Sequence, residues 1–144
     1  MGTVLVIYHS AGGNTKKLAE CVAEGAQSVA GAEVKLVPAG EVDYDAAAAA
    51  DGIAIGSPDY FSYVAGEVKA FFDKVLYDDR FKNKPCVTFG THGGGGKVLG
   101  VLDNLVKAIK FKPVAPGVLV KNAPDAEGAE QGRQLGKALA EAVA

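Results

Sequence analysis

Short apolar segments alternate with amphipathic segments along the whole chain, and this alternation constrains the fold more than any other feature. Strand-like apolar segments are predicted at residues 4–8, 33–37, 51–56, 85–90 and 114–120, the last of them broken by Pro116-Gly117. Helical periodicity follows each of them, at residues 15–30, 43–50, 64–76, 97–110 and from 124 to the end. Strands and helices in alternation predict a parallel sheet with helices packed on both faces.

These units predict an α/β fold: a three-layer, doubly wound, five-stranded parallel sheet with strand order 2-1-3-4-5. In this order the chain reverses direction between the first and third strands, and ligands bind at the carboxyl ends beside that switch point. The loops after the first, third and fourth strands then meet at one edge of the sheet. Because no repeat or linker interrupts the sequence, we expect a single domain over residues 1–144.

The composition is that of a globular protein and argues against several classes of function. The net charge is −2, and no basic stripe indicates a nucleic-acid partner. No apolar run approaches the ~20 residues that span a bilayer. With no signal peptide recognised before the first strand, we expect no membrane insertion and a cytoplasmic location. Cys21 and Cys86 are expected to be buried thiols, and no Cys/His cluster suggests a metal site.

The loop after the first strand has the features of a phosphate site. Gly12 and Gly13 allow a sharp turn, and Asn14 or Thr15 can cap the helix that follows. Free backbone N–H groups and the positive end of the helix dipole then favour an anion. The patterns of P-loop and dinucleotide sites are both absent. A simple connecting turn is the alternative interpretation.

The other two loops suggest a flat ligand. Tyr60, Phe61 and Tyr63 follow the third strand, and His92 precedes four glycines after the fourth. Aromatic faces stack on planar rings, and a run of glycines lets backbone N–H groups approach a ring edge, which would offset their conformational cost. A phosphate at one end and a flat, hydrogen-bonding ring at the other predict FMN. Alternatively, the aromatic residues pack over the sheet edge, and His92 is a packed, surface or proton-donating histidine.

Over essentially its full length the chain resembles the flavodoxin-like family, whose fold is a standard example of the switch-point rule above. Residues 10–15, Ser-Ala-Gly-Gly-Asn-Thr, resemble its S/T-x-T-G-x-T phosphate loop, with Gly12 in place of Thr. Residues 56–61, Gly-Ser-Pro-Asp-Tyr-Phe, resemble the G-S-P-T-Y-F loop of flavodoxin-like quinone reductases and related flavoproteins, with Asp59 in place of Thr. Residues 89–93 are similar to the ring-binding loop of short flavodoxins, with His92 where Tyr is common.

The resemblance implies a role for each loop. Residues 10–15 would bind the phosphate of FMN, while residues 58–61 and 91–93 would lie on the two sides of its ring. The predicted FMN-binding residues are Ser10, Ala11, Gly12, Gly13, Asn14, Thr15, Pro58, Asp59, Tyr60, Phe61, Thr91, His92, Gly93 and Gly96. A carboxylate at Asp59 pointing at the ring would lower its potential; the alternative is that Asp59 only makes the turn.

Two redox functions follow from the resemblance, and a third class is weaker. The first is a low-potential electron carrier between redox partner proteins, a reductase and an acceptor, acting as a monomer or weak homo-oligomer. The second is an NAD(P)H-dependent quinone or FMN reductase, favoured by the near-neutral charge and the residue 56–61 loop. A non-redox phosphate-binding or signalling domain would need acids, or Cys and Arg, that the first loop lacks. The short chain without insertions favours the carrier, and we predict no catalytic or metal-binding residue.

Overall fold

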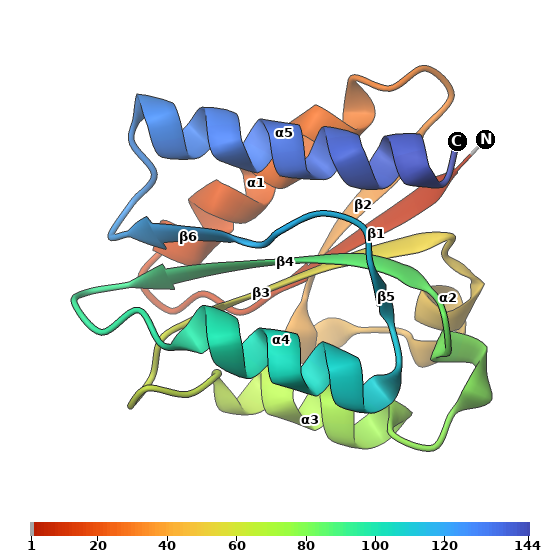
Figure 1. The fold of residues 1–144 in the computed structure, drawn as a ribbon, viewed down its shortest axis with the longest axis horizontal. Coiled ribbons are helices and arrows are strands. Elements are labelled where there is room, and N and C mark those ends of the chain that lie inside the picture. Colours follow the sequence, from red (N-terminus) through yellow and green to blue (C-terminus); the bar gives the residue numbers. More distant parts are fainter. Residues whose placement is uncertain (1) are drawn as a thin grey trace.

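The computed structural model describes residues 2–144 and shows a twisted parallel sheet with helices on both faces (Figure 1). The strands are β1 (Thr3–Tyr8), β2 (Glu33–Pro38), β3 (Gly52–Pro58), β4 (Pro85–His92), β5 (Lys112–Pro113) and β6 (Val118–Lys121). The α-helices are α1 (Asn14–Gln27), α2 (Tyr44–Ala49), α3 (Gly66–Val75), α4 (Val98–Ile109) and α5 (Ala126–Ala142). Short 3-10 helices lie at Ala39–Glu41 and Asp79–Phe81. None of the helices within residues 2–144 is both long enough and apolar enough to cross a membrane.

The strand order confirms the predicted doubly wound topology. The order is β2-β1-β3-β4-β5, with β6 also paired to β4, and the pairings are parallel. Val4, Val6 and Ile7 of β1 are completely buried, because this central strand is covered on both faces. The reversal of direction between β1 and β3 therefore lies where the sequence predicts it.

The last strand is predicted over residues 114–120 with a break at Pro116-Gly117, and the structure places its first piece before residue 114. The structure has two short strands: β5 pairs with the start of β4 and β6 with its end. Pro113 lies within β5 opposite Cys86, and the Val114 N–H still donates to the Cys86 carbonyl over 3.0 Å. Proline lacks an N–H group and cannot donate to a strand ladder, so the pairing is interrupted at Pro116. Gly117 packs tightly on β4, where an added Cβ would lie 2.5 Å from the Thr88 hydroxyl oxygen. The edge of the sheet beside β4 is thus formed by two short strands in place of one.

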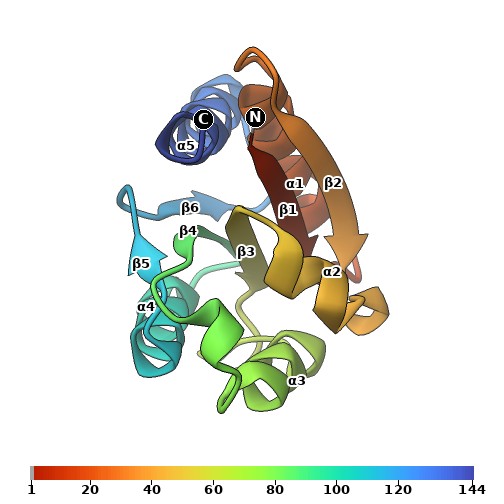
Figure 2. The same ribbon diagram turned by 90° about the vertical axis from the view of Figure 1, so that its right-hand side faces the viewer.

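The helices divide into two layers, each with its own apolar core (Figure 2). Helices α1 and α5 cover one face, where Leu18 and Leu139 are fully buried. Helices α2, α3 and α4 cover the other, where Phe71 and Phe81 pack edge to face. The N-terminus of α1 and the loops after β3 and β4 are held at the same sheet edge by this packing.

The two cysteines are both free thiols. Cys86, on β4, is buried as predicted, and burial raises the pKa of its thiol to about 12. Cys21, on α1, is a free thiol as expected but is only half-buried, so the expectation of burial is met in part there. Partial burial raises the pKa of Cys21 as well.

Candidate functional site

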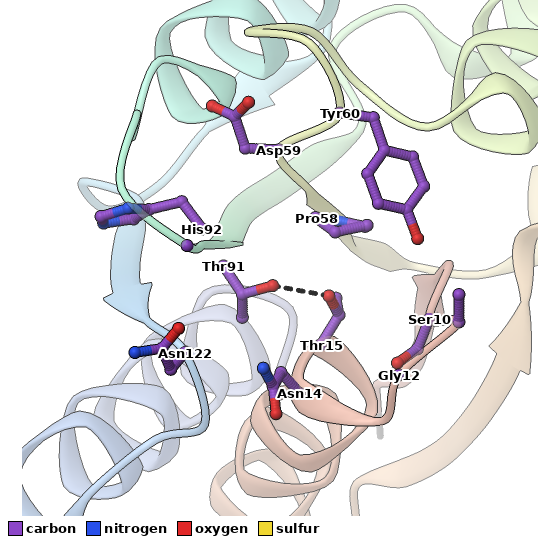
Figure 3. A pocket seen from close by; sticks show the side chains of 12 residues that line it. Ser10, Gly12, Asn14, Thr15, Pro58, Asp59, Tyr60, Thr91, His92 and Asn122 are labelled. Carbon is purple, nitrogen blue, oxygen red and sulfur yellow. Dashed lines mark hydrogen bonds between the residues drawn. The ribbon is translucent and has the colours of Figure 1, made fainter.

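The carboxyl ends of β1, β3 and β4 converge on one cavity of about 190 Å³ (Figure 3). Its lining residues are Ser10, Ala11, Gly12, Asn14, Thr15, Pro58, Asp59, Tyr60, Thr91, His92, Gly93 and Asn122. All of these except Asn122 are predicted site residues. The structure therefore brings the three predicted loops together.

The start of α1 forms the first wall of the cavity. Gly13 precedes the helix with a φ of 99°, a left-handed conformation that favours glycine, and its N–H donates to the Ser10 hydroxyl over 3.0 Å. We predicted a side-chain cap from Asn14 or Thr15, and this is wrong, because the helix begins at Asn14 with Gly13 in the cap position and no side-chain cap. The first turn also carries no acidic residue. An uncapped helix start of this kind suits an anion.

Two hydroxyl groups connect this wall to the end of β4. The Thr15 and Thr91 oxygens lie 2.7 Å apart and form a hydrogen bond in which either can donate. Both residues are buried, with 1% and 3% of their surface exposed. Since neither hydroxyl is open to solvent, the contact fixes the spacing between the first and third loops.

The loop after β3 forms a tight two-residue turn. Tyr60 and Tyr63 exchange backbone hydrogen bonds of 2.9 and 3.0 Å, with Phe61 and Ser62 between them at φ values of 58° and 64°. This turn places Tyr60 against the cavity. The rings of Tyr60 and His9 pack edge to face, with 5.9 Å between their centroids. Phe61 is fully exposed and does not line the cavity, unlike the position expected for it.

Asp59 makes a turn and does not aim its carboxylate at the cavity. Its Oδ1 accepts from the Ser62 N–H over 2.8 Å, and its Oδ2 accepts from the N–H groups of Lys97 and Val98 over 3.0 and 3.1 Å. Figure 3 shows the carboxylate directed away from Thr15 and Asn14. Of the two alternatives for Asp59, the structure has the turn.

The loop after β4 brings His92 and Gly93 to the cavity, with bare backbone beyond them. The Nδ1 atom of His92 is buried and has no hydrogen-bond partner among the described residues. A Cβ added to Gly93 or Gly94 would meet nothing within 4 Å. Gly96 does not line the cavity, although we predicted that it would; its φ of 76° turns the chain into α4. Because Nδ1 is enclosed by protein and Figure 3 shows the His92 ring directed away from Thr15 and Tyr60, this side of the cavity offers mainly open backbone.

Asn122 lines the cavity and was missed from the sequence. It follows β6, adopts a left-handed φ of 59°, and donates its N–H to the His92 carbonyl over 2.8 Å. Two signals were available: the last strand also ends at this sheet edge, and Asn tolerates left-handed backbone better than most residues. The prediction considered only the loops after the first, third and fourth strands, and so left out the residue that follows β6.

Comparison with known proteins agrees with this geometry. A family model described as flavodoxin matches residues 6–136. The chain is 37% identical over 163 aligned positions to a flavodoxin of Aquifex aeolicus (strain VF5), covering 100% of this chain and 88% of that protein. It is 31% identical to the type A flavoprotein fprA of Rhodobacter capsulatus, covering 96% of this chain but only 33% of that longer protein.

The same fold is found in a solved structure. A solved flavodoxin from the domain Archaea superposes with a TM-score of 0.91 at 24% identity, covering 98% of each chain. The matched family model and the full-length similarity to the Aquifex protein together span the β1, β3 and β4 loops of the cavity. The chain therefore belongs to the flavodoxin family.

Proposed function

We propose that this flavodoxin binds FMN in the cavity and carries electrons at low potential between redox partner proteins. The observation that carries the proposal is the convergence, on one cavity, of an uncapped helix N-terminus with two loops suited to a flat ring. Bound FMN would supply the redox chemistry, because its ring system accepts and releases electrons. The protein supplies binding, orientation and electrostatics.

The phosphate end of the site is the start of α1. The backbone N–H groups at Asn14 and Thr15, together with the Ser10 hydroxyl, would hold the phosphate. The positive end of the helix dipole adds attraction, and no acidic residue in the first turn opposes it. Gly12 stands where the related loops usually have Thr, so its backbone alone faces the ligand there. Neutral donors would therefore do most of the anion binding.

The ring end of the site lies between the loops after β3 and β4. Tyr60 would flank the ring from one side, with Pro58 beside it, while His92 and Gly93 flank it from the other. The open backbone at Gly93 fits a ligand that brings its own hydrogen-bonding edge. The residues present thus fit FMN at both ends.

Redox partners would approach at the exposed edge of this site. Phe61 is fully exposed beside the cavity, and Tyr60 and Tyr63 are 37% and 42% exposed. Exposed aromatic side chains in a group are typical of protein contacts. We further propose, on the sequence grounds given above, a cytoplasmic location and a monomer or weak homo-oligomer.

The competing function is an NAD(P)H-dependent quinone or FMN reductase, suggested by the residue 56–61 loop. The similarity to a flavodoxin over 88% of that protein's length favours the carrier. The FMN-loaded protein should therefore oxidise NADPH only slowly in the presence of benzoquinone. The same protein, after chemical reduction, should pass electrons rapidly to cytochrome c. Rapid multiple turnover with NADPH and quinone would contradict the carrier and support the reductase.

A further inference from the structure

We infer that Asp59 is a positioning residue whose carboxylate braces the two loops that flank the flavin ring, and so sets how tightly the ring is held. The inference rests on the proposed binding of FMN and extends it to one residue of this chain. Its basis is that a single carboxylate bonds to three backbone N–H groups in two loops far apart in the sequence.

The first contact supplies a cap that α4 lacks. The residue at its cap position is Lys97, whose side chain cannot accept a hydrogen bond, and the preceding residues are glycines. Asp59 provides the missing acceptor from the other loop, with Oδ2 taking the N–H groups of Lys97 and Val98. A carboxylate at a helix start is favoured both as a cap and by the helix dipole. The start of α4 is therefore held by the loop after β3.

The second contact supports a turn whose backbone conformation is unfavourable for the residues that form it. Phe61 and Ser62 both have left-handed φ values, as in the two-residue turns that prefer Asn and Gly. Oδ1 of Asp59 accepts from the Ser62 N–H inside this turn, and the Asp59 N–H donates to the Thr91 carbonyl over 2.8 Å. The turn that presents Tyr60 to the cavity is thus anchored both to β4 and to the carboxylate.

The two contacts together couple the opposite sides of the ring site. Tyr60 lies on one side, and His92 and Gly93 lie on the other, at the start of the segment that leads to Lys97 and the carboxylate. Gly95 lies alongside it, since a Cβ there would be 3.6 Å from Oδ2. Thr, which occupies this position in the related loops, has a single side-chain oxygen, whereas Asp59 uses one oxygen in the turn and the other at α4. The bracing is therefore a property of this chain's Asp.

The test compares flavin binding in Asp59→Ala and a matched control. Titration of the apoprotein should show riboflavin and FMN both weakened about tenfold in Asp59→Ala, with their affinity ratio unchanged, because charge-assisted contacts behind the ring are lost while the phosphate end is intact. The control is Asp43→Ala, since Asp43 caps α2 through the N–H groups of Asp45 and Ala46 and does not line the cavity. It should leave both affinities unchanged.

A second measurement needs no flavin. In the apoprotein, amide hydrogen exchange at Ser62 and at Val98 should accelerate together in Asp59→Ala, by about tenfold, because one carboxylate protects both groups. If Asp59→Ala does not fold, Asp59→Asn serves: its amide keeps one acceptor oxygen, so exchange should accelerate at one of the two groups only.

Several results would overturn the inference. Unchanged riboflavin affinity in Asp59→Ala, a loss confined to FMN, or an equal loss in Asp43→Ala would each do so. The bracing would also be contradicted if, in Asp59→Ala, amide hydrogen exchange accelerated at only one of Ser62 and Val98, or at neither. A wild-type protein that binds neither flavin would instead refute the proposed function, and the exchange measurement would still decide whether Asp59 holds the two loops.

Discussion

The hydroxyl oxygens of Thr15 and Thr91 lie 2.7 Å apart, one at the start of α1 and the other at the end of β4. Both side chains are buried, so each hydroxyl depends on the other for its hydrogen bond. The contact joins the proposed phosphate end of the site to its ring end. Removing this contact should lower the free energy of unfolding of the apoprotein.

Replacing either threonine with the isosteric valine leaves the other hydroxyl without a partner. We expect Thr15→Val and Thr91→Val each to lower the free energy of unfolding by about 1–3 kcal/mol. The double variant should cost less than the sum, with a coupling of about 1 kcal/mol. Urea unfolding of the four apoproteins measures this cycle. Strict additivity would show that the two hydroxyls do not interact.

The glycines between α1 and α5 permit a close helix contact. A Cβ on Gly136 would lie 1.8 Å from the Val22 carbonyl oxygen, so Gly136→Ala should destabilise the protein by about 3 kcal/mol or more. Gly100, inside α4, offers a matched control because a Cβ there meets nothing within 4 Å. Gly100→Ala should stabilise by about 0.5–1 kcal/mol through helix propensity. Thermal and urea unfolding of both variants would show opposite signs, and equal effects would contradict the packing.

Gly13 and Gly12 differ in backbone conformation although both lie in the first loop. Gly13 has a φ of 99°, so Gly13→Ala should cost about 1–3 kcal/mol in the apoprotein through backbone strain. Gly12 is not in the left-handed region, and a Cβ there has open space. Gly12→Ala should therefore change the free energy of unfolding by less than about 0.5 kcal/mol. A similar loss in both variants would disagree with this loop geometry.

The thiol of Cys86 should make stability depend on alkaline pH. Its pKa is raised from an ordinary value of 9.0 to about 12 in the folded protein by burial, with the Asp103 charge adding to the shift. Because the thiol holds its proton more firmly in the folded protein than in the unfolded chain, its contribution to the free energy of unfolding is fully present below pH 9. That contribution is lost as the pH rises towards 12.

The matching variant is Cys86→Ala, which loses packing at every pH but has no thiol to titrate. Its deficit in unfolding free energy relative to wild type should shrink by about 1–2 kcal/mol between pH 8 and pH 10.5. Urea unfolding of both proteins across this range measures the deficit. A constant deficit would contradict the raised pKa.

The strand order and the convergence of three loops were predictable because they depend on local patterns. The apolar run of β1 and the alternation of strands and helices determine the order, and parallel strands bring their carboxyl ends to one edge. Eleven of the twelve residues that line the cavity are among the predicted site residues, because they lie in the loops at that edge.

The features of the site that the sequence did not predict depend on contacts between segments far apart in the chain. Asp59 turns towards Lys97 and Val98 because α4 has no cap of its own, and no pattern near residue 59 encodes this. Phe61 points into solvent because a two-residue turn leaves it at the tip. Asn122 is brought to the site by the pairing of β6 with β4, where its N–H donates to the His92 carbonyl.

The most direct measurement is a fluorescence titration of the purified apoprotein with FMN and, separately, with riboflavin. The account predicts that the protein binds one equivalent of FMN and quenches its fluorescence. FMN should bind at least about a hundredfold more tightly than riboflavin, because the start of α1 binds the phosphate through charge-assisted hydrogen bonds. Failure to bind FMN, or equal affinity for the two flavins, would contradict it.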